Sequence, residues 1–291
     1  MTLFPYTGRF APSPTGALHF GSLVTALASY LDARANDGRW LLRMEDLDTA
    51  RTRKGAADQI LHDLERFGLQ WDGTVVYQNH RIAAYQAAFE RLHSAGRLYP
   101  CACSRRETAG RYAGVCAAGL RERQQTRSWR FRVPLPAVVR FEDRVQGVYL
   151  QDVHAALGDF IVRRADGPFA YQLAVVVDDA AQGVTHVVRG ADLLDNAPRQ
   201  ICLQQCLGLP TPQYAHIPVV MDENGRKLSK SAGAAILDDN APERELQRAL
   251  TFLGHELPRE LHGAPVADLL QWGIRSWSIG RIPRTAYCAC T

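Results

Sequence analysis

Residues 9–22 read RFAPSPTGALHFGS, and the pattern around this stretch predicts the fold. Residues 3–10 predict a short strand, and the prolines and glycine of residues 12–16 form a loop that neither a strand nor a helix can continue. Apolar residues then recur at helical spacing over 19–35, and residues 40–44 predict a buried strand. Strand, loop, helix and strand in this order begin an open parallel sheet, whose ligands collect at the carboxyl ends of its strands.

The first turn of the predicted helix is suited to phosphate. Free N–H groups and the helix dipole favour anions there, Gly21 would let a nucleotide approach the backbone, and His19 can donate to a phosphate oxygen. By themselves, these two residues are more often part of a proline-rich turn whose histidine caps the helix. The stretch therefore gives a hypothesis of nucleotide binding that needs support from elsewhere in the chain.

A second polar segment, KLSKS at residues 227–231, follows a turn sequence at residues 222–225. Lys227 and Lys230 are close enough in the sequence to clamp a polyphosphate together. Their charges would neutralise the negative charge that develops on phosphorus and on departing pyrophosphate. Taken alone, a lysine–serine run is more often solvated surface.

Together, the two segments resemble the HIGH and KMSKS motifs of class I aminoacyl-tRNA synthetases, in the order in which the family has them. The departures, Phe20, Ser22 and Leu228, leave the histidine, the glycine and both lysines in place. The resemblance implies a Rossmann-like α/β catalytic domain in which His19 and Lys230 act in catalysis. It also implies an ATP site, formed by His19, Gly21, Lys227 and Lys230.

Three stretches are similar to the glutamyl branch of that family: residues 9–16, 42–48 (LRMEDLD) and 188–194 (VRGADLL). The resemblance covers most of residues 3–235. It implies a pocket for L-glutamate, formed by Arg9, Ser13, Glu45, Tyr171 and Arg189. Two arginines for the carboxylates, an acid for the ammonium and a tyrosine hydroxyl match the charges of glutamate. Without the resemblance, Glu45 and Tyr171 would be interpreted as a charged strand end and a core aromatic residue.

Three cysteines lie within sixteen residues, a spacing that suits zinc. They are Cys101, Cys103 and Cys116. The spacing leaves the fourth ligand open among Tyr112, Glu107, His93 and water, because a phenol with a pKa of about 10 must lose its proton to bind. A resemblance to the zinc-bearing subgroup of short glutamyl synthetases, which have Cys-x-Cys followed by Tyr-x-x-x-Cys, implies that Tyr112 is the ligand and that the zinc is structural.

The rest of the chain predicts one insertion and a short helical end. Helical spacing recurs at residues 56–67 and 82–95, and apolar runs predict strands at 173–177 and 186–188. Residues 98–160 contain the cysteines, many arginines and short irregular strands. We expect a catalytic domain at residues 1–97 and 161–237, an inserted zinc-bearing subdomain at 98–160, and a helical region at 238–291 with helices at 242–253 and 266–277.

Two further features have weaker interpretations. The densest basic run of the chain lies in the insertion and would suit either RNA phosphates or a solvated face. It consists of Arg121, Arg123, Arg127, Arg130 and Arg132. Cys288 and Cys290 have no partner spacing that assigns them a role.

Composition sets broad limits on the class of protein. The chain has 291 residues and a net charge of +4, which permits a nucleic-acid partner without requiring one. Neither a leader segment nor eighteen uninterrupted apolar residues occur, so we expect no membrane partner and a cytoplasmic protein. Seven cysteines form an odd set that argues against a disulfide framework. A monomer is the default expectation.

About sixty residues follow Ser231, too few for the helical anticodon-binding half of glutamyl-tRNA synthetases. The resemblance and this shortness together imply that the chain activates glutamate with ATP, accompanied by Mg²⁺, and transfers it to the queuosine base at the wobble position of tRNA(Asp). The partner would be the anticodon loop of a queuosine-containing tRNA(Asp). Two alternatives remain: a fragment of a glutamyl-tRNA synthetase that charges tRNA(Glu), and a non-catalytic tRNA-binding paralogue.

Overall fold

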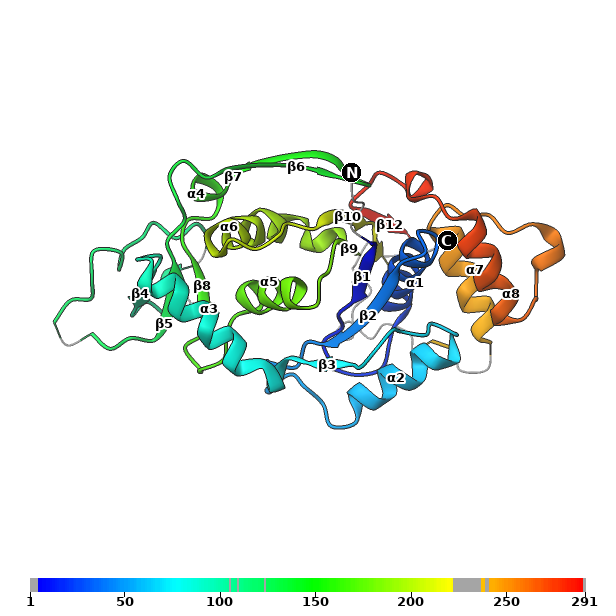
Figure 1. Cartoon of the computed structure of the whole chain (residues 1–291), viewed down its shortest axis with the longest axis horizontal. Coiled ribbons are helices and arrows are strands. Elements are labelled where there is room, and N and C mark those ends of the chain that lie inside the picture. Colours follow the sequence, from blue (N-terminus) through cyan, green and yellow to red (C-terminus); the bar gives the residue numbers. More distant parts are fainter. Residues whose placement is uncertain are drawn as a thin grey trace.

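The centre of the molecule is a parallel sheet with helices packed on it (Figure 1). The computed structural model describes residues 5–104, 106–108, 110–122, 124–221, 237–238 and 241–289. Strand β1 (Thr7–Phe10) pairs in parallel with β2 (Arg39–Met44), which pairs in parallel with β3 (Val76–Tyr77). The first strand–loop–helix–strand unit is therefore the one that the sequence predicts.

A second parallel pair extends this arrangement on the other side of β1. It consists of β9 (His186–Gly190) and β10 (Gln213–Ile217). The Thr185 N–H donates to the Thr7 carbonyl oxygen at 2.9 Å, so β9 lies beside β1. The α/β fold with a parallel sheet is confirmed.

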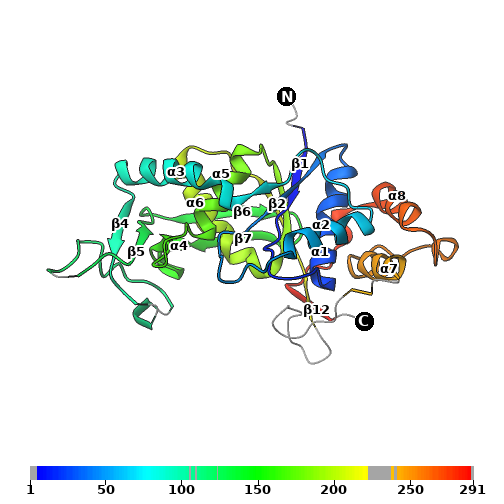
Figure 2. The same ribbon diagram turned by 90° about the horizontal axis from the view of Figure 1, so that it is seen from below.

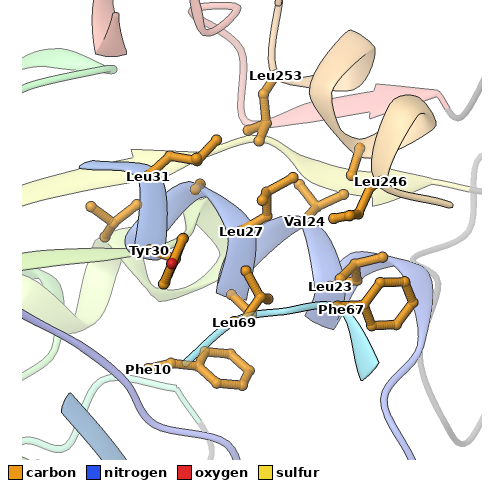
Figure 3. Close-up of a cluster of buried hydrophobic side chains, with 14 of the residues drawn as sticks. Phe10, Leu23, Val24, Leu27, Tyr30, Leu31, Phe67, Leu69, Leu246 and Leu253 are labelled. Carbon is orange, nitrogen blue, oxygen red and sulfur yellow. The ribbon is translucent and has the colours of Figure 1, made fainter. Parts of the chain in front are cut away.

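Helix α1 (Phe20–Arg34) connects β1 to β2 and forms the middle of the main core (Figure 3). Its side chains Leu23 and Leu27 are fully buried. Helices α7 (Pro242–Phe252) and α8 (Val266–Ser276) pack against α1 and share this core. The helical C-terminal region therefore shares the hydrophobic core of the sheet domain.

The predicted strand at residues 173–177 is wrong. These residues lie inside helix α5 (Tyr171–Ala181), which packs against α3 (Ile82–Ser94) and α6 (Ala197–Leu207). An apolar run of this length fits either a buried strand or a helix that is covered on several sides. Leu173 through Val176 are all buried, so apolar periodicity does not reveal the helix.

The insertion begins with a small antiparallel sheet, formed by β4 (Leu98–Cys101), β5 (Ser128–Phe131) and β8 (Phe160–Arg163). In both views this sheet and the α7–α8 pair lie at opposite ends of the molecule (Figures 1 and 2). Strand β8 completes this sheet, so the sheet includes residues 161–163, which follow the predicted end of the insertion at residue 160.

Between β5 and β8 the chain forms a regular hairpin of β6 (Val138–Asp143) and β7 (Gly147–Asp152), paired over their full length. The expectation of short irregular strands is wrong for this segment. Strand β6 also pairs in parallel with β10, through Asp143 opposite Tyr214. The hairpin therefore links the insertion to the central sheet by hydrogen bonds.

The remaining elements follow the predicted pattern closely. Helices α2 and α3 occupy the stretches with helical spacing, and the tail of the chain adds a strand, β12, that pairs in parallel with β11. No helix in the described part of the chain is long and apolar enough to cross a membrane. The elements not yet given are α2 (Ala56–Arg66), α4 (Val153–Ala156), β11 (Val219–Met221), β12 (Tyr287–Ala289), and the 3₁₀ turns Gln78–Arg81, Arg106–Thr108, Ala191–Asn196, Arg259–Leu261 and Ile279–Arg281.

Candidate active site

A cavity of about 1060 Å³ lies at the carboxyl ends of the central strands β1, β2, β9 and β10. Residues that end or directly follow these strands, such as Phe10, Glu45 and Pro218, line it. Seven of the predicted site residues line it together: Arg9, Ser13, His19, Gly21, Glu45, Tyr171 and Arg189. The two lysines of the predicted ATP site, Lys227 and Lys230, lie outside the described residues.

The buried base of the cavity is a charge network around Asp179. Asp179 Oδ1 lies 3.4 Å from Arg9 Nε and 2.8 Å from Arg43 Nη2. Arg43 Nη2 also lies 3.5 Å from Glu45 Oε1. Burial acts to raise the pKa of Asp179, but Arg43 and Arg9 lower it below its usual value. Asp179 thereby stays a carboxylate between two guanidinium groups.

Glu45 is the acid that reaches the cavity from the end of β2. Its backbone N–H donates to the Pro12 carbonyl oxygen at 2.9 Å, which fixes this strand end against the loop after β1. Burial raises the pKa of the Glu45 carboxyl, although Arg43 and Arg9 act in the opposite direction. An ammonium group beside Glu45 would favour its charged form.

Arg189, on β9, reaches the cavity beside Tyr171, the first residue of α5. Arg189 Nη1 donates to the Tyr171 hydroxyl at 3.4 Å, and burial raises the pKa of that hydroxyl. Arg189 Nε donates to His216 Nε2 at 2.9 Å, and His216 Nδ1 lies 2.6 Å from Asp143 Oδ2. Sequence reasoning missed His216 and Asp143, because neither lies in a stretch with a recognisable motif.

His19 caps α1, and its Nδ1 accepts a hydrogen bond from the Ser22 N–H at 3.3 Å. A Cβ atom on Gly21 would lie 3.2 Å from His19 Cε1. The missing side chain at position 21 therefore lets the imidazole lie over the first turn of the helix. The helix cap that the sequence left as an alternative is present, and both residues line the cavity at the N-terminal end of α1, where a helix presents backbone N–H groups.

The rim of the cavity contains ion pairs that the sequence did not predict. Arg164 Nη1 donates to Asp48 Oδ2 at 2.9 Å, and Arg51 Nε donates to the same oxygen at 2.8 Å. Asp48 follows β2, whereas Arg164 directly follows β8 of the antiparallel sheet. All three residues line the cavity, so the segment that follows the antiparallel sheet contributes to its wall.

The three predicted zinc-binding thiols form a cluster, with their sulfur atoms all within 4.8 Å of one another. Cys101 and Cys116 are buried, and Cys103 is half-buried. The Tyr112 hydroxyl lies 3.4 Å from Cys101 Sγ and 3.8 Å from Cys103 Sγ. It also accepts a hydrogen bond from the Cys116 N–H at 3.0 Å. Three thiols and a phenol therefore converge on one point, as a four-coordinate zinc site requires.

Two of the alternative ligands have other contacts. The Glu107 carboxylate accepts hydrogen bonds from the N–H and the hydroxyl of Ser104, at 2.8 and 2.7 Å. His93 stacks on Phe89 and packs edge-on against Trp129. Within the described part of the chain, the cluster contains neither of them.

Arg130 lies directly against the thiol cluster and is buried. Its Nε donates to Cys101 Sγ at 3.3 Å, and its guanidinium carbon lies 3.6 Å from the centre of the Tyr112 ring. Burial acts to raise the pKa of Cys101, but hydrogen bonds from Tyr112 and Arg130 lower it to about 7. Cys101 thus favours the thiolate form that zinc binds, whereas burial raises the pKa of Cys103 to about 11.

The arginine run is therefore not one RNA-facing surface. Arg132 is half-buried, and it donates to the Ala117 carbonyl oxygen at 2.9 Å. Arg121 and Arg127 are exposed, and Arg123 lies outside the described residues. At most the exposed members remain available for phosphate, because Arg130 and Arg132 are occupied inside the insertion.

A family model described as tRNA synthetases class I (E and Q), catalytic domain, matches residues 6–254. The chain therefore belongs to the class I tRNA synthetases of the glutamate and glutamine type, and it is a ligase-type enzyme. Within this class, it belongs with the proteins named glutamyl-Q tRNA(Asp) synthetase.

The relative from Thiobacillus denitrificans is 54% identical over 95% of this chain and 94% of its own length. That from Aromatoleum aromaticum is 52% identical over 96% and 91%, and that from Neisseria gonorrhoeae is 50% identical over 98% and 99%.

Solved structures show the same fold. A glutamate tRNA ligase from Elizabethkingia meningosepticum, crystallised in complex with its amino acid, superimposes with a TM-score of 0.82 at 23% identity. The alignment covers 98% of this chain and 67% of that one. The glutamate-tRNA synthetase from Elizabethkingia anophelis gives a TM-score of 0.84, also at 23% identity, over 99% and 68% of the two chains. At this identity the likeness supports the class I fold alone.

Proposed function

We propose that this chain activates L-glutamate with ATP and transfers it to the queuosine base at the wobble position of tRNA(Asp). Curated relatives at 50–54% identity over nearly their whole length carry the name glutamyl-Q tRNA(Asp) synthetase. The charge of the cavity supports glutamate as the amino acid. The arrangement at the start of α1 supports ATP as the second substrate.

The observation that carries the proposal is the charge balance of the amino-acid pocket. Among the predicted glutamate-binding residues that line the cavity, Arg9 and Arg189 are positive and Glu45 is the one carboxylate. These three residues have one positive charge in excess. Glutamate, with two carboxylates and one ammonium, supplies the missing negative charge. Glutamine lacks the second carboxylate, so one of the two lining arginines would have no ligand carboxylate to bind.

Each pocket residue takes a role that its chemistry allows. Arg9 and Arg189 hold the two carboxylates of glutamate, because guanidinium groups bind carboxylates through paired N–H donors. Glu45 pairs with the ammonium group. The hydroxyls of Tyr171 and Ser13 complete the polar contacts, and both residues line the cavity.

In the activation step, an oxygen of the glutamate α-carboxylate attacks the α-phosphorus of ATP, and pyrophosphate leaves with the bonding electron pair. His19 and the backbone around Gly21 bind phosphate oxygens at the start of α1. Lys227 and Lys230, which lie outside the described residues, neutralise the departing pyrophosphate. Mg²⁺ bound to ATP would share this charge.

In the transfer step, a hydroxyl oxygen on the cyclopentene ring of queuosine attacks the carbonyl carbon of glutamyl-adenylate. AMP leaves, and the hydroxyl proton is lost to solvent or base. The reaction gives an ester between glutamate and the modified base, with no covalent enzyme intermediate. The anticodon loop of tRNA(Asp) is the part of the RNA that must reach the cavity.

We further propose that the insertion at residues 98–160 holds one structural zinc ion through Cys101, Cys103, Tyr112 and Cys116. Zinc would cross-link the end of β4 to the loop that contains Tyr112 and Cys116. Residues 1–97 and 161–237 form the catalytic domain in this proposal, and residues 238–291 form the helical region that packs on α1.

The test incubates the enzyme, ATP and labelled glutamate with three RNAs: tRNA(Asp) containing queuosine, tRNA(Asp) without it, and tRNA(Glu). Label should appear only on the queuosine-containing tRNA(Asp). Label on tRNA(Glu) alone would instead support a tRNA(Glu)-charging activity. Binding of RNA without any labelling or pyrophosphate exchange would support a non-catalytic paralogue.

A further inference from the structure

A buried line of hydrogen bonds connects the cavity to the hairpin of the insertion. It starts at Arg189 on β9, passes through His216 on β10, and ends at Asp143, the last residue of β6. Each of the three side chains is at most 3% exposed. Only Arg189 lines the cavity, so His216 and Asp143 act on a ligand only through it.

The chemistry of the line fixes the tautomer of His216. An arginine Nε–H can only donate, so His216 Nε2 must be the acceptor in the 2.9 Å contact. The ring proton therefore resides on Nδ1, from which it is donated to Asp143 Oδ2 at 2.6 Å. Burial lowers the pKa of His216 to about 4, so the ring is neutral, as this role as acceptor requires.

Asp143 is itself held as an acceptor. Its Oδ1 accepts backbone N–H groups from Val145, Gln146 and His216, at 3.0, 2.9 and 3.0 Å. Burial acts to raise the pKa of Asp143, but the hydrogen bonds from His216 and the backbone lower it below its usual value. Because these three hydrogen bonds fix Oδ1, they also fix the direction in which Oδ2 accepts from the His216 ring.

His216 accepts a hydrogen bond from Arg189 Nε, whereas the outer nitrogens of Arg189, Nη1 and Nη2, make only long hydrogen bonds. Nη1 and Nη2 have contacts of 3.4 Å, to the Tyr171 hydroxyl and to the Leu193 carbonyl oxygen. The guanidinium also lies over the Tyr214 ring, 5.3 Å from its centre. The planar group is thus oriented from behind, and its outer N–H donors remain available for a carboxylate.

We propose that Asp143 and His216 are positioning residues that orient Arg189 to bind a carboxylate of the substrate. This inference rests on the proposed function, because it assumes that the cavity binds glutamate. It adds that the hairpin of the insertion, through Asp143, is part of the machinery that recognises the amino acid. Pre-orientation of Arg189 would lower the entropy that binding otherwise loses.

The decisive variant is Asp143→Asn. Asparagine keeps one oxygen to accept the backbone N–H groups but turns the other position into a donor toward His216 Nδ1. The ring proton must then move to Nε2, where it opposes the Arg189 Nε–H. The KM for glutamate should rise by about tenfold to a hundredfold, as for the loss of a hydrogen bond to a charged group. The KM for ATP should change less than about twofold.

Substitutions at His216 separate positioning from packing. In His216→Gln the side-chain oxygen can still accept from Arg189 Nε, so the KM for glutamate should stay close to that of the wild type. His216→Leu has no acceptor, and its KM should rise as in Asp143→Asn. Adding Asp143→Asn to His216→Gln should have little further effect, because glutamine has no tautomer to reverse.

The assay is glutamate-dependent ATP–pyrophosphate exchange, with queuosine-containing tRNA(Asp) present, and thermal unfolding confirms that each variant folds. Asp159→Asn is the matched control: Asp159 is buried and accepts from the Tyr99 hydroxyl and the Val133 N–H, away from the cavity. An unchanged KM for glutamate in folded Asp143→Asn, or an equal rise in both KM values, would overturn the inference. Absence of glutamate-dependent exchange in the wild type would overturn the proposed function instead.

Discussion

Arg43 Nη2 lies 2.8 Å from Asp179 Oδ1 beneath the amino-acid pocket, and the same oxygen lies 3.4 Å from Arg9 Nε. Two arginines of like charge thus share one buried carboxylate. Without the Asp179 carboxylate, the two buried guanidinium groups would repel each other strongly, because little water screens their charges. Asp179 therefore supports both the stability of the fold and the position of a residue that is proposed to bind substrate.

Asp179→Asn should lower the free energy of unfolding by about 3 kcal/mol, because it removes the carboxylate that lies nearest to the buried Arg43 and that pairs with Arg9. Urea unfolding followed by circular dichroism measures the change. Asp166→Asn is the control, since it removes the carboxylate of an exposed pair with Arg164 and should change stability by less than about 1 kcal/mol. Equal effects of the two substitutions would contradict the buried network.

The pH dependence of this difference has a defined sign. Arg43 and Arg9 hold the pKa of Asp179 below its usual value, against the effect of burial. A carboxyl whose pKa is lowered on folding contributes stability that is complete above the unfolded pKa of about 3.9 and is lost as the pH falls toward the folded value. The stability gap between wild type and Asp179→Asn should be full at pH 7 and shrink below about pH 4. A gap independent of pH would argue that the charge of Asp179 is not what matters.

Gly21→Ala should separate stability from activity. Alanine in place of a helical glycine stabilises a helix by roughly 0.5–1 kcal/mol. The added Cβ would lie 3.2 Å from His19 Cε1 and would displace the imidazole from the first turn of α1. We expect an unfolding temperature no lower than that of the wild type and a pyrophosphate exchange rate at least about tenfold lower. Gly280→Ala is the control and should leave the exchange rate unchanged, because the added Cβ would make an ordinary contact of 3.7 Å with Ser278 Oγ.

The zinc site can be tested by metal content, independently of activity. Cys101→Ser should leave well under one zinc per chain after dialysis against a chelator. Tyr112→Phe should retain more, with an affinity lowered about tenfold to a hundredfold, because three thiolates remain. Cys206→Ser, a half-buried thiol outside the cluster, should match the wild type. Equal zinc content in all four proteins would refute the site.

Local patterns in the sequence predicted the first part of the fold well. The proline and glycine punctuation and the helical spacing placed α1 and β2 within one residue of their observed limits. The seven predicted site residues in the described part of the chain also lie together on one cavity, because most of them stand near a strand end or at the start of a helix. These are positions where a short stretch of sequence determines both the backbone and the direction of the side chain.

Other features depend on contacts between distant parts of the chain. Asp143 and His216 are 73 residues apart, and their contact exists only because β6 pairs with β10. The apolar run at residues 173–177 predicts a strand but lies in helix α5, because this part of the helix is buried on several sides. Arg130 read as part of a basic surface, but its strand position turns it inward onto Cys101. In each case tertiary packing decides the outcome, and no local pattern carries that information.

Lys230→Ala addresses the segment outside the described residues. The chain has three lysines, of which two are Lys227 and Lys230, whereas arginine supplies nearly all of its other positive charge. A lysine ammonium is a compact, mobile charge, suited to following a leaving group. Lys230→Ala should therefore bind glutamate as the wild type does, by calorimetry, but lose about a hundredfold to a thousandfold in pyrophosphate exchange. Lys230→Arg should fall between the two, because it keeps the charge with a different shape. Lys54→Ala, an exposed lysine outside the cavity lining, should leave exchange unchanged. If Lys230→Ala exchanged pyrophosphate at the wild-type rate, the residue would have no part in the activation step.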